Sequence, residues 1–341
     1  MAQLFTPYRL KGLELKNRIV MAPMCQYSVT AKDGKPNDWH YVHLTSRAIG
    51  GTGLILVEMT DVEPDGRITD YDLGLWSDDH IPAFARIIEA CHGYGAKVGI
   101  QIAHAGRKAE DAPEPVAPSA IRFDAPGYKM PRELTTDEVR QMVDKFGQAA
   151  RRAVAAGVDT IELHGAHGYL IHQFQSPVTN HRTDEYGKDL SRFGVEVIRA
   201  VKRQMPDDMP LIIRVSAVEY VEGGYGLDHI IEICRKYKEA GVDMIHVSSG
   251  GEGRPAPNHR PGNYPGYQVP FARAIKQALD IPVIAVGVLE DFHLAESVVA
   301  NQDADLVAIA RGMLRDPYWA LHAAQALGVK PDVPKQYERA F

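Results

Sequence analysis

The chain has 341 residues, 45% of them hydrophobic and 24% charged, which is the composition of a globular protein with a large core. Its net charge of −6 gives no sign of the basic surface that nucleic acid or anionic lipid requires. Cys25, Cys91 and Cys234 form no CxxC pair, so neither a disulfide framework nor an iron–sulfur cluster is expected. No apolar run approaches the roughly 18 residues of a membrane span, and the first residues lack a signal pattern. We therefore expect a cytoplasmic protein that acts on small molecules.

Short apolar segments recur along the whole chain, and each is followed by a loop and a longer segment with helical periodicity. Strands are predicted at residues 18–24, 54–59, 97–102, 160–163, 211–215, 244–247, 283–286 and 306–310. Helices are predicted near residues 39–49, 80–93, 136–156, 190–204, 228–240, 268–279, 291–300 and 317–327. The order is strand then helix, eight times.

An internal similarity supports repeated units, because residues 155–161 (AAGVDTI) resemble residues 239–245 (EAGVDMI), and residues 302–307 are a looser version. Eight such units predict a single (β/α)8 TIM barrel domain over residues 1–341. The alternative is a doubly wound open sheet, whose first strand would normally lead into a Gly-rich phosphate-binding turn. Here the first strand leads into Met24-Cys25-Gln26-Tyr27, which favours the barrel.

Three segments exceed what a minimal barrel of about 250 residues needs. Residues 1–17 predict an N-terminal hairpin around Lys11-Gly12 that closes the bottom of the barrel. Residues 104–134 are rich in proline, contain Arg107 and Lys108, and show too little apolar periodicity for an element of their own. Residues 249–267 form a second Gly/Pro-rich loop, and both loops are expected to extend over the C-terminal face and cover a ligand.

The fourth strand runs into His164, His167 and Tyr169, separated only by Gly and Ala. Two imidazoles aimed at one oxygen would polarise a carbonyl or nitro group, and a phenol is suited to protonating a strongly basic carbanion. Two histidines at this spacing are also plausible metal ligands, or hydrogen-bonded core residues. The sequence offers no cluster of His, Asp or Cys to complete a metal site, so none is expected.

The other strand ends carry a set of residues that could bind one ligand together, because the chemistry of TIM barrels lies at this face. They are Pro23, Met24, Cys25 and Tyr27 after strand one, Gln101 on strand three, Arg214 on strand five, Gly287 after strand seven, and Ala310 and Arg311 after strand eight. The ends of strands seven and eight commonly hold a phosphate, which Arg311 could pair with. An amide, an arginine and imidazoles beside a phosphate site suit a flat heterocycle with a phosphate tail, and FMN fits that description.

Five motifs in this chain resemble those of the old yellow enzyme family of FMN-dependent ene-reductases, within it the shorter bacterial, thermophilic-like subgroup. They are NRIVMAPMCQY at 17–27, GIQIAHAGRK at 99–108, HGAHGYL at 164–170, NHRTDEYG at 180–187 and QYER at 336–339. The match spans nearly the whole chain.

The resemblance implies a role for each matching residue. FMN would be bound non-covalently by Ala22, Pro23, Met24, Cys25, Met59, Gln101, His164, Arg214, Gly287, Ala310 and Arg311, with Cys25 tuning its reduction potential. His164 and His167 would hold the carbonyl or nitro oxygen of an activated alkene, Tyr27 would add a contact, and Tyr169 would donate the proton to the α-carbon. NADPH or NADH would be the co-substrate in ping-pong kinetics.

The subgroup also places a C-terminal arginine in the active site of a neighbouring subunit, and Arg339 stands at that position. The resemblance therefore implies a homodimer or homotetramer. Two departures stand out: Lys188-Asp-Leu-Ser-Arg192 is a shortened loop, and Met59 is bulky where relatives often have a small residue.

Two other functional classes stay open from the residues alone. A sugar-phosphate aldolase or isomerase barrel would use the same phosphate site, but it would need a lysine or carboxylate base at a strand end, and Lys97 lies at a strand's start. A catalytically idle flavin-binding protein is the non-enzyme alternative.

Overall fold

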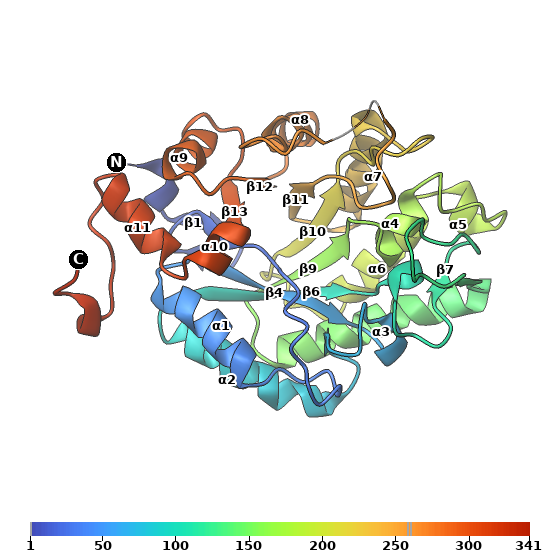
Figure 1. The fold of residues 1–341 in the computed structure, drawn as a ribbon, viewed down its shortest axis with the longest axis horizontal. Coiled ribbons are helices and arrows are strands. Elements are labelled where there is room, and N and C mark those ends of the chain that lie inside the picture. Colours follow the sequence, from blue (N-terminus) through green and yellow to red (C-terminus); the bar gives the residue numbers. More distant parts are fainter. Residues whose placement is uncertain (1, 258, 260) are drawn as a thin grey trace.

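The computed structural model describes residues 2–257, 259 and 261–341, and its centre is a closed barrel of eight parallel strands (Figure 1). In barrel order these are β3 (Ile19–Met21), β13 (Leu306–Ile309), β12 (Val283–Val286), β11 (Met244–Ser248), β10 (Leu211–Ser216), β9 (Thr160–Gly165), β6 (Lys97–Ala103) and β4 (Leu54–Asp61). Pairing of β3 with β4 closes the ring. The predicted TIM barrel is confirmed.

Eight helices surround the strands, one after each, as Figure 1 shows. They are α1 (Asp38–Ile49), α2 (Ile81–His92), α3 (Thr136–Ala155), α6 (Arg192–Lys202), α7 (Leu227–Ala240), α8 (Val269–Leu279), α9 (Phe292–Ala300) and α11 (Trp319–Ala326). All eight lie where the sequence predicts them. Their buried faces pack on the outward side chains of the strands in one large apolar cluster, which includes Leu163, Ile213 and Val247.

The inside of the barrel changes from apolar to polar along the strands. Alternate residues of a strand share a face, so Ile212, Arg214 and Ser216 point to one side of β10. Ile212 belongs to an inner apolar cluster, whereas Arg214 is paired in register with His164 and His246. The carboxyl ends of the strands therefore collect the polar side chains.

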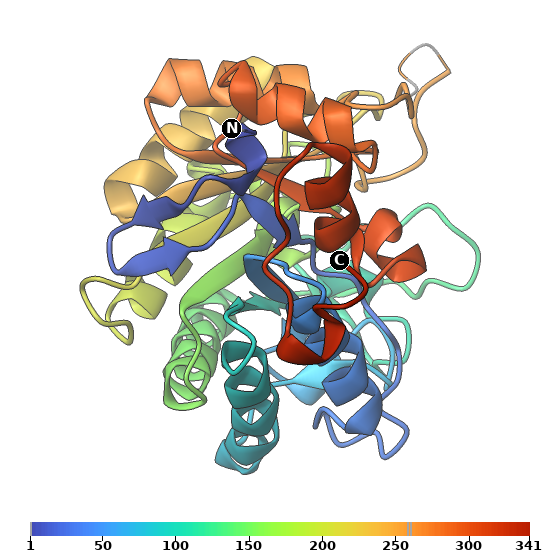
Figure 2. The same ribbon diagram turned by 90° about the vertical axis from the view of Figure 1, so that its left-hand side faces the viewer.

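The bottom of the barrel is closed by the predicted hairpin, β1 (Tyr8–Leu10) and β2 (Leu13–Leu15), visible at the left of Figure 2. Lys11 takes φ 52° in the turn between the two strands. Leu13 and Leu15 alternate with exposed Glu14, and both leucines pack into the inner cluster with Leu54 and Ile212. The period of two residues thus places the apolar side of the hairpin in the barrel.

Three expectations need correction. The first strand is shorter than predicted, because Pro23 has no amide to continue the ladder beyond Met21 and Ala22. Residues 104–134 do form small elements: the 3₁₀ turn η4 (Gly106–Lys108) and the paired strands β7 (Val116–Ala117) and β8 (Arg132–Glu133). Short helices that the sequence did not reveal also follow the strands, namely α4 (Leu170–Gln175), α5 (Glu185–Lys188) and α10 (Arg311–Arg315).

The remaining elements are short. They are β5 (Leu73–Gly74), which extends the pairing of β4, and the 3₁₀ turns η1 (Gln3–Phe5), η2 (Pro64–Gly66), η3 (Asp78–His80) and η5 (Lys335–Tyr337). In the shortened loop before α6, Asp189 accepts hydrogen bonds from Ser191 and Lys236. Among the described residues, none of the helices has both the length and the apolar character that a membrane crossing requires.

Candidate active site

The end of β9 brings three aromatic side chains together. The His164 ring lies 5.2 Å from that of His167 and 4.8 Å from that of Tyr169, centroid to centroid, and both pairs meet edge to face. A tight turn makes this possible, because His167 and Gly168 take φ values of 59° and 72° before α4 begins at Leu170. Positive φ is costly for a residue other than glycine and is concentrated at functional sites.

Hydrogen bonds and burial define how these side chains can react. Nδ1 of His164 accepts from the Ala166 amide at 3.3 Å, so its ring proton lies on Nε2. Nε2 of His167 lies 2.7 Å from the Ser248 hydroxyl, which can donate to it and leave the proton on Nδ1. Burial, and then the charge of Arg214, lower the pKa of both histidines well below the usual value. Both rings are therefore neutral hydrogen-bond donors near neutral pH.

Tyr169 is held as a protonated phenol. Burial is the main reason that the pKa of Tyr169 is raised well above 10, and the electrostatic effect of the neighbouring Cys25 adds to it. Tyr169 and Cys25 pack against one apolar cluster, formed by Met59, Ile68, Ala103, Ala105, Ala109 and Ala112. Burial and the carboxylates of Asp72 and Glu58 raise the pKa of Cys25, so this residue carries a thiol. The bulky Met59 lies inside that cluster with 1% of its surface exposed.

The segment after β3 lines one side of the barrel mouth. Ala22 is fully buried, Pro23 is buried, and Met24 and Cys25 are partly buried. Tyr27 is 48% exposed and takes φ 50°. The side chain of this tyrosine is therefore open to solvent at the rim.

The polar layer inside the barrel lies below the histidines. The Gln101 amide donates to Glu162 at 2.7 Å, and the other oxygen of Glu162 lies 2.7 Å from Nδ1 of His246. Arg214 is buried beside them; burial lowers the pKa of its guanidinium, and the charge of Glu162 acts in the opposite direction. Among the described residues, Nε of Arg214 has no hydrogen-bond partner.

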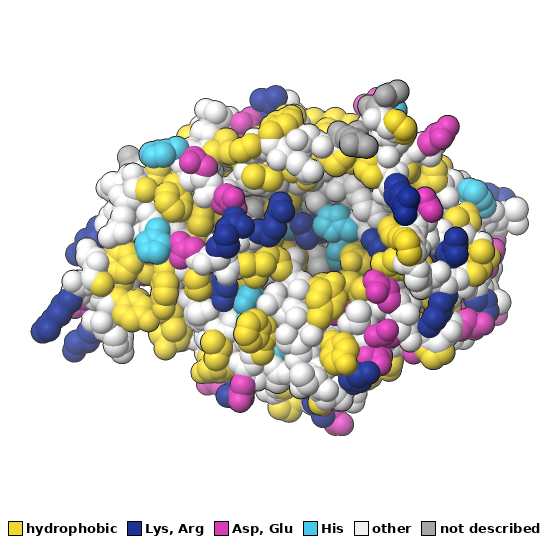
Figure 3. All heavy atoms as spheres, in the orientation of Figure 1, with side chains coloured by type: hydrophobic (Ala, Val, Ile, Leu, Met, Phe, Trp, Pro, Cys, Tyr) yellow, Lys and Arg dark blue, Asp and Glu magenta, His cyan; other side chains and the backbone are white. Residues whose placement is uncertain are grey.

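A cavity of about 520 Å³ opens beside Arg214 at the ends of β11, β12 and β13. Four predicted residues line it: Arg214, Gly287, Ala310 and Arg311. Figure 3 shows a hollow on this face with basic and histidine side chains around it. Val288, also in the lining, takes φ 51°, a strained conformation for a β-branched residue. The other predicted residues are not part of its lining.

The cavity fits the phosphate and ring of FMN by its donor set. Arg311 and Arg315 supply two guanidinium groups, of which Arg315 pairs with Glu290 in the same lining, and Arg214 supplies a buried one whose Nε has no partner among the residues that the structure describes. At Gly287 an added Cβ would lie 2.6 Å from the Gln268 amide, so glycine keeps the backbone of this loop close to the cavity wall.

Several residues of this region were missed by the sequence reasoning. Ser248, Tyr267, Gln268 and Arg315 also line the cavity. Ser248 directly follows a predicted strand, so extending that strand by one residue would have found it. Arg315 is one turn beyond Arg311 on α10, a helix too short to give a periodic signal.

Lys108, in the loop after β6, is a further neighbour of the histidine turn. Its ammonium group donates to the His167 carbonyl at 2.9 Å and lies 4.9 Å from the centre of the Tyr169 ring. Burial lowers the pKa of Lys108 to about 8. The 3₁₀ turn η4 thus brings a cation against the predicted acid.

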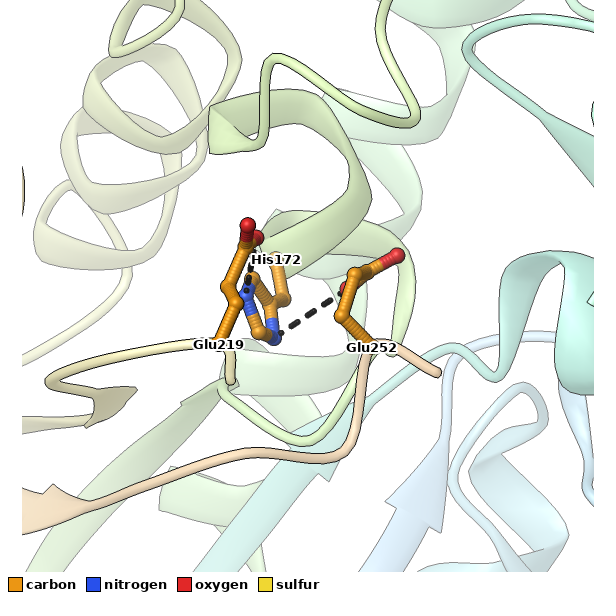
Figure 4. Close-up of side chains that lie close together, drawn as sticks. All are labelled: His172, Glu219 and Glu252. Atoms are coloured by element: carbon orange, nitrogen blue, oxygen red, sulfur yellow. Dashed lines mark hydrogen bonds and ion pairs between the residues drawn. The ribbon is translucent and has the colours of Figure 1, made fainter. Parts of the chain in front are cut away.

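His172, Glu219 and Glu252 are the group of described residues whose ligand atoms lie close enough to consider a metal ion. Nε2 of His172 is 3.0 Å from Glu219, whereas the opposite nitrogen, Nδ1, is 3.4 Å from Glu252. Figure 4 shows the imidazole between the two carboxylates. One ion cannot be bound by both carboxylates and a single ring nitrogen in this arrangement, because the ring separates them.

Arg339 lies away from the barrel mouth of its own chain. The residue is exposed, and Figure 1 shows the C-terminus at the periphery beyond α11. Nearby, the Tyr337 hydroxyl is 3.0 Å from that of Tyr318, and the ring of Phe341 lies 6.2 Å from that of His322. Lys97, the lysine that a Schiff-base aldolase would need, is at the opposite end of the barrel and pairs with Asp159 at 2.9 Å.

Comparison with known proteins gives a consistent result. The model of the NADH:flavin oxidoreductase / NADH oxidase family matches residues 3–329. An NADPH dehydrogenase of Listeria innocua is 48% identical over 344 residues and covers both chains completely.

Solved structures agree with this. Morphinone reductase superposes with a TM-score of 0.82 at 27% identity, covering 98% of this chain and 92% of its own. The old yellow enzyme homologue from Zymomonas mobilis also gives 0.82, at 25% identity, covering 98% of this chain and 96% of its own.

Proposed function

The chain belongs to the NADH:flavin oxidoreductase / NADH oxidase family, and from that premise we propose that it reduces the C=C bond of activated alkenes with NADPH through bound FMN. Enones, enals, maleimides and nitroalkenes are the substrate class. The observation that carries this proposal is the gathering of the His167 and Tyr169 rings around that of His164, at 5.2 and 4.8 Å between ring centroids, beside a cationic cavity.

FMN, when bound, supplies the hydride chemistry between nicotinamide and alkene. Its phosphate would be held by Gly287, Ala310 and Arg311, and its ring by Arg214, Gln101 and the segment from Ala22 to Cys25. Arg214 places a fixed positive charge in a buried site, where it would stabilise negative charge on the ring. Cys25 and Met59, which pack in one apolar cluster, would contact the same ring, and the thiol would tune its reduction potential.

His164 and His167 would bind the carbonyl or nitro oxygen of the alkene. Both rings are neutral, so each can donate an N–H bond without adding a full charge to the pocket. The same bonds strengthen as negative charge develops on that oxygen, which lowers the barrier. Tyr27, exposed at the rim, would add a contact to the substrate.

Tyr169 would deliver the proton to the α-carbon. Its raised pKa keeps the phenol protonated until a strongly basic carbon is formed. A second subunit would complete the pocket with Arg339, because this exposed residue lies on a tail at the periphery of the chain. At least a homodimer is therefore proposed.

The visible spectrum of the purified protein tests this function. We expect flavin bands that bleach on anaerobic addition of NADPH and return on addition of cyclohexenone or maleimide. Bands that bleach with NADPH but return only with oxygen would contradict alkene reduction. A colourless protein that fails to take up added FMN would contradict the flavin site as well.

A further inference from the structure

The backbone amide of Gly168 donates to Nδ1 of His172 at 2.8 Å. Gly168 sits between His167 and Tyr169, in the left-handed part of the turn, where the chain makes no regular backbone ladder. A side-chain acceptor is therefore what satisfies this buried amide. His172 itself is fully buried on α4 and does not line the cavity.

The ring of His172 is fixed from its other side. Nε2 lies 3.0 Å from Glu219 and 2.9 Å from the Tyr225 hydroxyl, which in turn donates to the Ser216 carbonyl at 2.9 Å. The second oxygen of Glu219 accepts from the Tyr225 amide at 2.9 Å. Since Nδ1 must accept from Gly168, the ring proton lies on Nε2 and points to Glu219. One tautomer is thus selected by the loop after β10.

Residues from the loops after β6 and β11 also contact this region, and Figure 4 shows one of them, Glu252, beside His172. Glu252, 2% exposed, lies 3.4 Å from Nδ1 and pairs with Arg107 at 2.8 Å. The neighbouring Gly251 packs so tightly on the turn that a Cβ there would lie 2.3 Å from Cα of His167. The histidine turn is therefore supported by residues from four successive loops.

We propose that His172 is a positioning residue for alkene reduction: through its Nδ1 acceptor and the tautomer set by Glu219, it holds the His167–Gly168–Tyr169 backbone in the shape that aims His167 and Tyr169 at the substrate. The inference rests on the function proposed above. It deepens that function, because the residue touches neither substrate nor FMN and acts through one backbone amide. Small displacements of oriented groups can cost about 100-fold in rate.

Two substitutions separate this role from core packing. In His172→Asn the amide oxygen stands near the position of Nδ1 and can still accept from Gly168. In His172→Gln the amide stands near the position of Nε2, so the contact with Glu219 is kept and the Gly168 bond is lost. Both variants remove the ring and Asn leaves the larger cavity, so a role in packing alone would make His172→Asn at least as harmful as His172→Gln.

The experiment measures holoenzyme of both variants and of the unchanged chain. We expect His172→Gln to lower kcat/KM for cyclohexenone about 10-fold or more, and His172→Asn to stay within about threefold of the unchanged chain. Hydrogen exchange of peptides covering residues 164–171 should speed up in His172→Gln alone, while peptides from β6 (97–103) stay unchanged. Equal rates and equal exchange in the two variants would overturn the proposal.

A measurement on the unchanged chain protects the test against a variant that does not fold. In protein labelled with ¹⁵N-histidine, and with the signal assigned by its loss in His172→Asn or His172→Gln, His172 should show a protonated Nε2 and a bare Nδ1. A protonated Nδ1 would overturn the inference. If the unchanged chain fails to reduce alkenes, the proposed function falls, yet the exchange and tautomer data still decide whether His172 holds the turn.

Discussion

Burial decides the protonation state that each residue of the barrel mouth brings to the reaction. It raises the pKa of Tyr169 and lowers those of His164 and His167, so the proposed acid and the two proposed oxygen-binding groups are all uncharged. Neutral hydrogen-bond donors suit the uncharged alkene of the proposed reaction, because no counterion has to leave the pocket before the alkene binds. This matches a pocket that two uncharged reacting groups, an enone and a nicotinamide, would visit in turn.

Tyr169→Phe should separate the two half-reactions. The variant keeps the ring but loses the proton, so reoxidation of the reduced enzyme by cyclohexenone should slow by about 100-fold. Reduction by NADPH needs no such proton and should change less than about twofold. Stopped-flow traces of each half-reaction measure this, and equal slowing of both would argue against Tyr169 as the acid.

Asp72 provides a pH test of stability. Burial raises its pKa to about 7 from an ordinary 3.8. Between these values the unfolded chain ionises Asp72 while the folded chain keeps the proton, so stability falls as pH rises and levels off above about 7. Asp72→Asn removes this loss, and its advantage over the unchanged chain should grow by roughly 2 kcal/mol between pH 5 and pH 8.

Urea unfolding at several pH values measures that difference. Asp65→Asn is the matched control, because Asp65 is exposed on the neighbouring 3₁₀ turn η2. A constant gap between Asp72→Asn and the unchanged chain across this range would show that the carboxyl is ionised in the folded state.

The barrel strands and outer helices were predictable from the sequence because each strand is a buried apolar run and each helix repeats every 3.6 residues. The short helices α4, α5 and α10 were not, because helices of six, four and five residues are too short to show that period. The missed part of the site follows from this. Arg315 and His172 lie on α10 and α4, whereas Arg214 lies on a predicted strand and His164 directly follows one.

The resemblance and the strand-end rule together identified the residues of the barrel mouth, but neither could give their partners. Glu219 and Glu252 come from loops whose sequence has no periodicity, and only the fold brings them to the same imidazole. Contacts between residues 47 and 80 positions apart are set by barrel closure. A single sequence therefore predicted candidate residues for the barrel mouth but not the residues that contact and support them.

At the N-terminal hairpin, Leu15→Ala should destabilise the protein. Leu15 is 2% exposed inside the inner cluster, and removing such a side chain from a core costs about 2–5 kcal/mol. Glu14→Ala on the same strand is the control and should cost less than about 1 kcal/mol, because Glu14 is exposed and forms a surface ion pair with exposed Arg9. Chemical denaturation of both variants measures this. Equal losses would contradict the role of the hairpin as a plug.

The whole assembly can be tested by mixing defective subunits. If Arg339 serves a neighbouring pocket, Arg339→Ala and Tyr169→Phe each impair every site of their own homo-oligomer. A mixed dimer instead holds one pocket with an intact Tyr169 and an intact Arg339. Co-expression of the two variants should restore about a quarter of the sites for random dimers. Activity no higher than the mean of the separate variants would show that Arg339 acts within its own chain or not at all.

The N-terminal hairpin fills the bottom of the barrel, so reactants have access from the other end, where the strands have their carboxyl ends. Leu13 and Leu15 occupy the inner cluster below the polar layer, so in the proposed reaction nicotinamide and alkene would approach from the same side. In each turnover the oxidised nicotinamide would then have to dissociate before the alkene can bind. We expect high concentrations of alkene to inhibit the enzyme by competing with NADPH for the same pocket. The alkene concentration that gives the highest rate should therefore rise with the concentration of NADPH.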